Sequence, residues 1–353
     1  MPKPDALDRL EAARTALEDD APRALRLLPP PKALPAFVRA ERDYLEGEAL
    51  RAMGYLAKAE TLFSKALKAK DDPVLLAEAS LSSAAVLRSL GRTAEARTRL
   101  KAAMPKAFGH RLRLEKAMVD RAEGLHEKSL RVLRPMLAQA VASADWAEVG
   151  FLLWAIGGAE RLMGWLEESS ASFERSLEFF RRAGDKSGAG YALFGLAGVS
   201  RIKGELEASL RHYREAGRMF ASTDDVFGKA YALCGTANAL RQLGRLKEAD
   251  AFYQRSEKLY SSLGDEVDLA YVVWGRGKIR LHSGKLPEAE ALLKKALAMF
   301  ARGGETRGVL LSQLALGQAL YAQGRTAEGE ALHAAAMRGA QRAGLHTHLE
   351  VFT

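Results

Sequence analysis

Residues 204–250 read GELEASLRHYREAGRMFASTDDVFGKAYALCGTANALRQLGRLKEAD, a stretch that begins and ends with one short pattern. The first copy is GELEASL at 204–210 and the second is GRLKEAD at 244–250. Related copies occur along the 353-residue chain, each beginning with a glycine: Gly54, Gly91, Gly124, Gly164, Gly204, Gly244, Gly284 and Gly324. The successive spacings are 37, 33 and then five times 40 residues. A period that recurs in this way indicates an array of structural repeats.

Small residues occupy two fixed positions around this glycine. Seven residues before it stand Gly47, Ala84, Ala117, Gly157, Ala197, Ala237, Gly277 and Gly317. Five residues after it stand Ala59, Ala96, Ser129, Ser169, Ser209, Ala249, Ala289 and Gly329. Small side chains let two helices cross closely, and the apolar residues on both sides recur at helical spacing. Each repeat is therefore predicted to be two antiparallel helices joined by a glycine turn.

A second turn separates one predicted hairpin from the next. The later second turns are AGD at 183–185, STDD at 222–225, LGD at 263–265 and GGE at 303–305. Glycine favours the end of a helix, and an acidic side chain favours the start of the next one. A ninth, degenerate unit lies upstream, where Asp19 takes the place of the turn glycine. The sequence thus predicts an all-α fold of about nine helix hairpins.

These columns resemble the tetratricopeptide repeat, which has a small residue in its first helix, a turn glycine and alanines in its second helix. The 40-residue period departs from the usual 34 and is similar to the longer variant in kinesin light chains, spindle-orientation adaptors and bacterial quorum-peptide receptors. The resemblance covers nearly the whole chain. It implies a right-handed superhelical solenoid whose first helices line a concave face. It also implies non-catalytic work as an adaptor, scaffold or peptide sensor.

Four segments are expected along the chain. Residues 1–39 form a degenerate N-terminal capping hairpin, residues 40–109 hold repeats 2–3, residues 110–343 hold repeats 4–9, and residues 344–353 are a C-terminal tail. Pro29, Pro30 and Pro31 end the first hairpin near Leu28, because proline removes backbone donors. Pro105 and Gly109 suggest a bend between residues 104 and 112. The tail is interpreted either as a segment that occupies a groove, its own or a neighbour's, until a partner displaces it, or as a frayed end or a short stretch packed on the last predicted helix.

The family geometry implies that residues thirteen, ten, six and three positions before the turn glycine face the groove. The position three before it is arginine in six repeats: Arg51, Arg88, Arg121, Arg161, Arg201 and Arg241. Aromatic residues gather at the positions thirteen and ten before the glycine: Phe151, Trp154, Tyr191, Phe194, Tyr231, Tyr271 and Trp274. Asn238 and Lys278 occupy the position six before the glycine. Arginine beside aromatic rings is typical of binding hot spots, so we expect an extended peptide with acidic and apolar side chains.

Other interpretations remain open for the same residues. Trp154 and Trp274 can simply pack between neighbouring first helices, and the arginines can cap carbonyls at helix C-termini. The net charge of +9 also allows nucleic acid, RNA or single-stranded DNA, to follow the arginines. Because the 44 acidic residues are interleaved through the repeats and no basic tail exists, a protein or peptide partner is favoured.

The sequence holds no catalytic signature such as a phosphate-binding glycine loop or a zinc-protease motif. No cofactor or metal ion is expected, and Cys234, the single cysteine, is interpreted as a small core residue. No apolar run has the roughly 18 residues that a membrane helix needs. We therefore expect a cytoplasmic protein with no membrane partner, and leave open a homo-oligomer formed through the end repeats or the tail.

Overall fold

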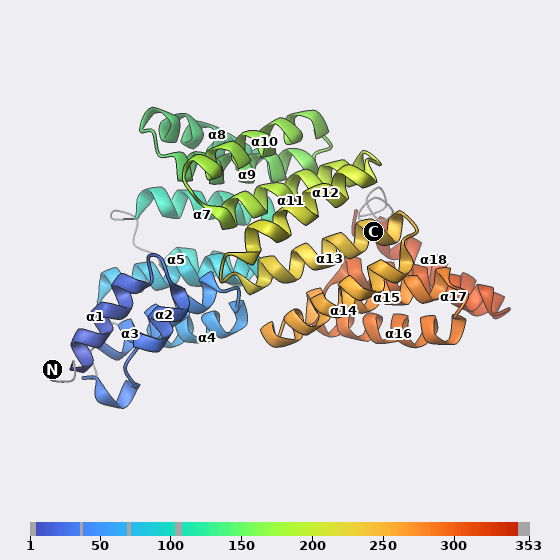
Figure 1. Cartoon of the computed structure of the whole chain (residues 1–353), viewed down its shortest axis with the longest axis horizontal. Helices are drawn as coiled ribbons and strands as arrows, with labels where there is room; N and C mark the ends of the chain where they lie inside the picture. The colour runs from blue at the N-terminus through green and yellow to red at the C-terminus, as the bar shows by residue number, and fades with distance from the viewer. Residues whose placement is uncertain (1–4, 36–37, 69–71, 103–107, 345–353) are drawn as a thin grey trace. The chain divides into compact units, whose positions relative to one another are not determined.

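The computed structural model describes residues 5–35, 38–68, 72–102 and 108–344. These ranges contain eighteen α-helices and one short 3₁₀ helix, and no β-strand occurs in them (Figure 1). The helices follow one another as nine hairpins, with the recurring glycine turn inside each hairpin from α3 onward. The predicted all-α class and the hairpin repeat are confirmed. Odd-numbered helices, the first of each hairpin, are called A helices below, and even-numbered ones B helices.

Contacts within the chain divide it into two compact units. The first is Met1–Gly195 with Ser222–Val226, and the second is Leu196–Ala221 with Phe227–Thr353. Helices of the first unit are α1 (Ala6–Ala16), α2 (Ala21–Leu27), η1 (Pro31–Ala33), α3 (Arg39–Ala52), α4 (Leu56–Ala66), α5 (Pro73–Ser89), α6 (Thr93–Ala102), α7 (Gly109–Ala122), α8 (His126–Ala142), α9 (Trp146–Leu162) and α10 (Leu166–Arg182). Those of the second are α12 (Leu206–Ala221), α14 (Leu246–Leu263), α15 (Glu266–His282), α16 (Leu286–Gly303), α17 (Thr306–Ala322) and α18 (Thr326–Arg342). Two A helices cross the boundary: α11 (Lys186–Ile202) and α13 (Val226–Gln242).

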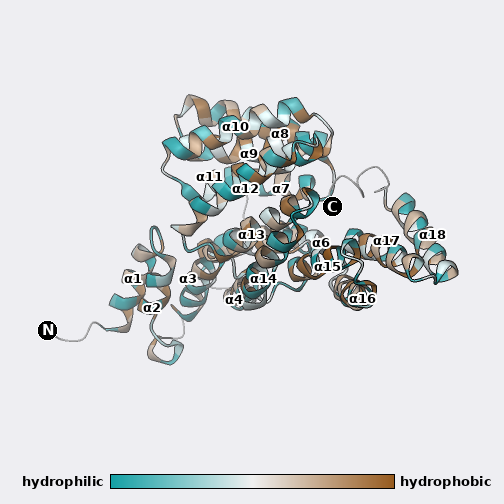
Figure 2. Cartoon of the chain, turned by 45° about the vertical axis from the view of Figure 1, so that its right-hand side comes forward, coloured by the Kyte–Doolittle hydropathy of each residue, from teal (hydrophilic) through white to brown (hydrophobic). Residues whose placement is uncertain are grey.

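Inside each unit, helices pack against their neighbours in sequence and A helices also pack against A helices. In the first unit α1 contacts α3, α3 contacts α5, and α5 contacts α7, while in the second unit α15 contacts α17. Hydrophobic and hydrophilic residues alternate around most helices, as expected when one stripe of each helix is buried (Figure 2). The A helices of a unit therefore lie side by side and present a common face.

Glycine turns connect the two helices of each hairpin. All eight turn glycines have φ between 71° and 87°, a left-handed conformation that side chains oppose. At the second turns, the carboxylates of Asp185 and Asp265 accept hydrogen bonds from the backbone N–H groups of Gly188 and Asp268, at 2.8 and 3.0 Å. Glu305 makes no such cap, because its carboxylate accepts a hydrogen bond from the Tyr271 hydroxyl at 3.1 Å instead.

Rings from B helices lie against glycines of the next A helix. A Cβ atom added to Gly195 of α11 would stand 2.3 Å from the Phe173 ring of α10, and one added to Gly235 of α13 would stand 2.2 Å from the Tyr213 ring of α12. Both rings are buried. These two glycines stand nine residues before the turn glycine. In the small column two residues further on, a Cβ added to Gly277 would stand 2.9 Å from the Leu293 side chain, so small residues at both positions let the helices approach closely.

Two expectations fall on residues that the structure does not describe. The bend predicted between residues 104 and 112 lies largely in the undescribed range 103–107, next to the first residue of α7. The tail predicted for residues 344–353 lies outside the described residues from residue 345 on.

The close crossing at Gly235 predicts that Gly235→Ala destabilises the second unit by about 1–3 kcal/mol through overpacking against Tyr213. Gly217→Ala in α12 is the matched control, because its added Cβ would meet only the Ala232 Cβ at 3.7 Å. That control is expected to be neutral or to gain up to about 1 kcal/mol from helix propensity. Urea unfolding followed by circular dichroism distinguishes the two. Equal stability of both variants would mean that the crossing is not close.

Candidate functional site

Seven of the predicted groove residues belong to the second unit and are called the second-unit surface: Arg201, Tyr231, Asn238, Arg241, Tyr271, Trp274 and Lys278. Those on α13 and α15 recur at intervals of three, four or seven residues, so each set lies on one helix face. The arginines and Lys278 lie toward the C-terminal ends of the A helices, and the tyrosines lie nearer the N-terminal ends. The surface thus has a cationic end and an aromatic end.

Trp274 forms the floor of the cationic end. Its side chain is only 4% exposed, and its indole Nε1 donates a hydrogen bond to the Leu311 carbonyl oxygen of α17 at 3.3 Å. The Arg241 guanidinium lies over the indole, 5.2 Å from the ring centroid. Trp274 therefore packs between neighbouring A helices, as in the packing interpretation, and also holds Arg241 by a cation–π contact.

Asn238 is oriented by groups of its own unit. Its Oδ1 accepts a hydrogen bond from the Tyr253 hydroxyl at 2.5 Å, and its Nδ2 lies 3.8 Å from the Cys234 sulfur. Burial raises the pKa of both Tyr253 and Cys234 to about 12, so both groups keep their protons at neutral pH. Cys234 is buried, as the core interpretation expects. The Asn238 side chain is therefore fixed with its amide hydrogens defined.

Positive charges at the cationic end act on one another. Burial lowers the pKa of Lys278 to about 8, and the neighbouring Arg241 acts in the same direction. Burial, Lys278 and Arg241 together lower the pKa of His282 at the end of α15. No carboxylate is among the groups that shift these two pKa values, and the Lys278 Nζ donates to the Gln318 Oε1 at 3.3 Å. Within the described part of the chain, the charge of Lys278 is therefore not compensated by a carboxylate.

The aromatic end lies beside acidic groups at the start of α15 and α17. Burial raises the pKa of Asp268 well above its usual range, and Asp265 and Glu305 raise it further. A raised pKa favours the uncharged form of Asp268, which reduces the negative charge there. Tyr271 donates its hydroxyl to Glu305, whereas the Tyr231 ring is 37% exposed. Tyr231 is the more accessible of the two rings.

Five further predicted residues belong to the first unit: Phe151, Trp154, Arg161, Tyr191 and Phe194. Their rings form one continuous cluster along α9 and α11, with centroid distances of 5.6 Å for Phe151–Trp154, 6.4 Å for Trp154–Tyr191 and 5.7 Å for Tyr191–Phe194. Phe194 is buried, and the other three rings and Arg161 are half-buried. The structure therefore brings together the aromatic residues that the sequence placed in repeats 5 and 6 of the chain.

The first three arginines of the predicted row differ in their surroundings. Arg51 pairs with Glu48 at 2.6 Å and Arg88 pairs with Glu115 at 2.5 Å, so the chain neutralises both. Arg121 instead lies over the Trp154 ring, 5.0 Å from its centroid. Burial lowers the pKa of Arg121, and Arg88 and Arg161 add to this effect. Arg51 and Arg88 are thus neutralised by glutamates of the chain, whereas Arg121 lies against an indole ring.

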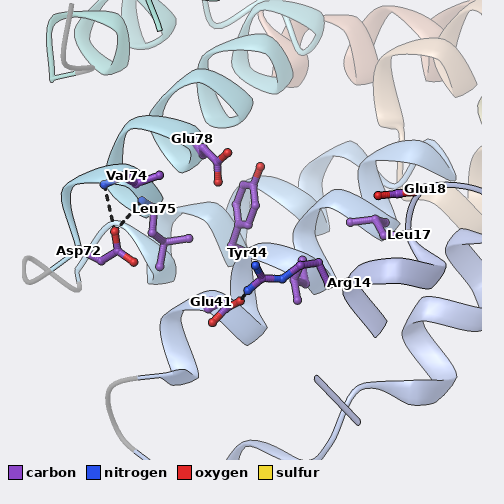
Figure 3. A pocket seen from close by; sticks show the side chains of 10 residues that line it. Arg14, Leu17, Glu18, Glu41, Tyr44, Asp72, Val74, Leu75 and Glu78 are labelled. Atoms are coloured by element: carbon purple, nitrogen blue, oxygen red, sulfur yellow. Dashed lines mark hydrogen bonds and ion pairs between the residues drawn. The ribbon is translucent and has the colours of Figure 1, made fainter. Parts of the chain in front are cut away.

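An acidic cavity in the first unit was not among the predicted sites. It encloses about 430 Å³ between α1, α3 and α5 and is lined by Tyr44, Glu41, Glu78 and Asp72 (Figure 3). Arg14 forms an ion pair with Glu41, and burial with Glu48 and Glu78 raises the pKa of Tyr44 to about 12. The sequence contained a signal for this cavity, because three of its residues stand thirteen or ten positions before Gly54 or Gly91: Glu41, Tyr44 and Glu78. These are positions that the family geometry assigns to the groove.

Comparisons with known proteins match this architecture. A family model described as tetratricopeptide repeat matches residues 228–302, within α13–α16. No curated protein matches the sequence. The crystal structure of a Rap protein complexed with Competence and Sporulation Factor is similar with a TM-score of 0.59 and 14% identity, over 90% of this chain and 96% of that one. A signal transduction ATPase with a tetratricopeptide repeat sensor from Pyrococcus horikoshii gives 0.63 and 16%, over 99% of this chain and 55% of that one. At these identities the likeness concerns the fold.

Two further structural features concern membrane spans and metal sites. No helix among the described residues is long and apolar enough to cross a membrane. The same residues contain no group of three or more His, Cys, Asp or Glu side chains that could hold a metal ion.

The electrostatics of the cationic end predict that Lys278 titrates near pH 8 rather than near its ordinary 10.5. Its folded-state pKa lies below the unfolded value, so charged Lys278 opposes folding below pH 8, and this cost fades as the pH rises from 8 to 10.5. Arg241→Gln should raise the Lys278 pKa, because one repelling cation is removed. NMR titration of lysines labelled at Cε measures both values. A midpoint near 10.5 in the unchanged protein would contradict the prediction.

Proposed function

We propose that the second-unit surface binds an extended peptide segment of a partner protein, since the chain carries tetratricopeptide repeats and is a protein-interaction module. Carboxylates of that segment lie at the cationic end, beside Arg201, Arg241 and Lys278. Its apolar side chains contact Tyr231 and Tyr271. The proposal assigns binding and no catalysis to the chain, and it places this binding in the cytoplasm.

The observation that carries the proposal is the arrangement of the cationic end, where Lys278 Nζ donates to the Gln318 Oε1 and the Arg241 guanidinium lies over the Trp274 ring. Burial and Arg241 disfavour the charged form of Lys278, and no carboxylate of the described chain compensates for them. A ligand carboxylate would supply the missing negative charge and raise the Lys278 pKa again. Binding between about pH 8 and 10 would therefore take up a proton. A guanidinium fork such as that of Arg241 suits a carboxylate in geometry as well as in charge.

Asn238 and the tyrosines supply the remaining contacts. A carboxamide nitrogen carries two hydrogens, and the Asn238 Nδ2 makes a weak contact with the Cys234 sulfur. One of its hydrogens can therefore be donated to a peptide carbonyl, which suits an extended backbone. The exposed ring of Tyr231 offers apolar area at low entropic cost, as aromatic residues in binding hot spots do.

The first-unit cluster gives the proposal a second contact surface. Phe151, Trp154, Tyr191 and Phe194 form its apolar part, and Arg161 lies about two helical turns beyond Trp154 on α9. A protein of similar fold, the Rap protein, was crystallised with Competence and Sporulation Factor. Because the two sequences share 14% identity, the ligand of the Rap protein does not define the ligand of this chain. The proposed ligand chemistry therefore follows from the residues of this chain.

Removing two cations of the second-unit surface tests the proposal. Full-length chain is used to capture partners from nuclease-treated native lysate, and the captured proteins are quantified by mass spectrometry. Arg201→Gln with Arg241→Gln is expected to lower capture of the main partner at least tenfold, because each charge-assisted hydrogen bond contributes about 1.5–3 kcal/mol.

Arg245→Gln with Arg325→Gln is the matched control. It changes the net charge by the same amount, but these arginines stand in turns and pair with Glu248 and Glu328. Capture by the control should equal that of the unchanged chain. Equal loss in both double variants would show non-specific attraction, and capture that depends on the presence of nucleic acid would favour the phosphate-binding alternative.

A further inference from the structure

A separate cavity lies in the second unit on the other side of α13. It encloses about 510 Å³ between α12, α13 and α14. Among its lining residues, Thr236 stands two positions before Asn238 on α13, which places the two side chains about 200° apart around the helix. The cavity therefore faces away from the second-unit surface, and a ligand bound in it would be independent of peptide binding on that surface.

The repeat columns explain why a hollow exists here. Thirteen residues after the turn glycine, six of the eight repeats have a large apolar residue: Leu67, Met104, Leu137, Leu177, Leu297 and Met337. In α12 this position is Gly217, where an added Cβ would meet only the Ala232 Cβ at 3.7 Å. Eight residues before the turn glycine, Ile156, Leu196 and Leu316 correspond to the smaller Thr236. The large side chains of the other repeats are absent at this place.

The rim of the cavity has also changed, toward positive charge. Lys229 of α13 stands fifteen residues before the turn glycine, where four other repeats have Val149, Ala189, Leu269 and Val309 and one has Arg39. Arg214, Arg218 and Arg255 complete the charged lining, and no acidic residue is part of it. Within the described ranges these four cations form no hydrogen bond or close ion pair, although Arg214 acts electrostatically on Glu248. Turn arginines behave differently, as the 2.8 Å pair of Arg245 with Glu248 shows.

Most of the remaining lining is apolar. Phe252 and Leu259 of α14 and Leu233 of α13 are half-buried at the cavity, and the Arg255 guanidinium lies 5.3 Å from the Phe252 ring centroid. Apolar walls with a few convergent charged groups, in a volume between about 300 and 1,000 Å³, are typical of small-ligand sites. The four cations require that the ligand be an anion.

We propose that this cavity binds a compact organic anion with an apolar body, such as an alkyl or aryl carboxylate or phosphate. The apolar body occupies the space over Gly217, and the anionic group lies among Arg214, Arg218, Lys229 and Arg255. The ligand is compact because the hollow is confined to one repeat. The equivalent positions in α10 and α16 are filled by Leu177 and Leu297, so no continuous groove is left for a long chain.

Competition binding on the full chain tests the ligand class. The probe is 8-anilinonaphthalene-1-sulfonate, followed by its fluorescence at low salt. Octanoate is expected to displace it, while octanamide, which lacks the charge, and inorganic phosphate, which lacks the apolar body, act at least tenfold more weakly. Equal displacement by octanoate and octanamide would overturn the anion requirement, and equal displacement by phosphate would overturn the apolar one.

Two pairs of variants place the binding in the cavity. Gly217→Leu restores the residue of the other repeats and should lower octanoate affinity at least tenfold while raising the thermal midpoint, so that lost binding cannot be ascribed to unfolding. Gly217→Ala leaves most of the space and should bind nearly normally. Arg255→Gln should weaken binding several-fold, whereas Lys295→Gln, at the equivalent position of the next repeat, should not. Normal octanoate affinity in Gly217→Leu would overturn the proposal.

Discussion

The contact on which the rest of the structure depends is the crossing of an aromatic ring and a glycine. The Phe173 ring of α10 lies between Gly157 of its own hairpin and Gly195 of the next A helix. One ring therefore joins two hairpins, and the absence of a Cβ on either side lets the helices approach. Because this side of each A helix is committed to packing, the ligand-binding chemistry of an A helix is confined to the face that the rings do not cover.

Equivalent positions recur in every repeat, so a residue that differs from its counterparts in the other repeats is informative. Glycine in three A helices, at positions 188, 228 and 308, lies against a phenylalanine of the preceding B helix. In α15 the equivalent residue is Asp268, and the equivalent ring is Tyr260. Burial raises the pKa of Tyr260, and Asp268 raises it further. Both members of one packing pair thus became polar in a single repeat, beside the second-unit surface. Gly217 of α12 and Lys229 of α13 also differ from their counterparts in other repeats, and both line the cavity on the other side of α13.

The sequence predicted the fold well because period and turn chemistry are local properties. Five equal spacings and a glycine before each pattern were enough to place the hairpins, and every turn glycine has the left-handed conformation. The site was predicted less fully, since a column gives a helix face but neither the depth of a side chain nor its partner on another helix. Trp274 is therefore buried under Arg241, Arg88 pairs with Glu115 from 27 residues away, and Glu305 bonds Tyr271 rather than capping α17. Gly217 in place of a leucine leaves space between α12, α13 and α14. The sequence did not predict this cavity, because its walls come from neighbouring helices.

These contacts determine which of the charges behind the net +9 are balanced by a neighbouring carboxylate. Arginines that directly follow a turn glycine pair with a glutamate three residues later, as Arg92 does with Glu95, Arg245 with Glu248 and Arg325 with Glu328. Such pairs are exposed and contribute little to stability, but they cancel the charge of the turns. In the second unit, Lys278 of the second-unit surface and Lys229 at the cavity have no such carboxylate partner among the described residues. Because apolar side chains lie beside both lysines, apolar contact as well as charge would select among the anions that approach them.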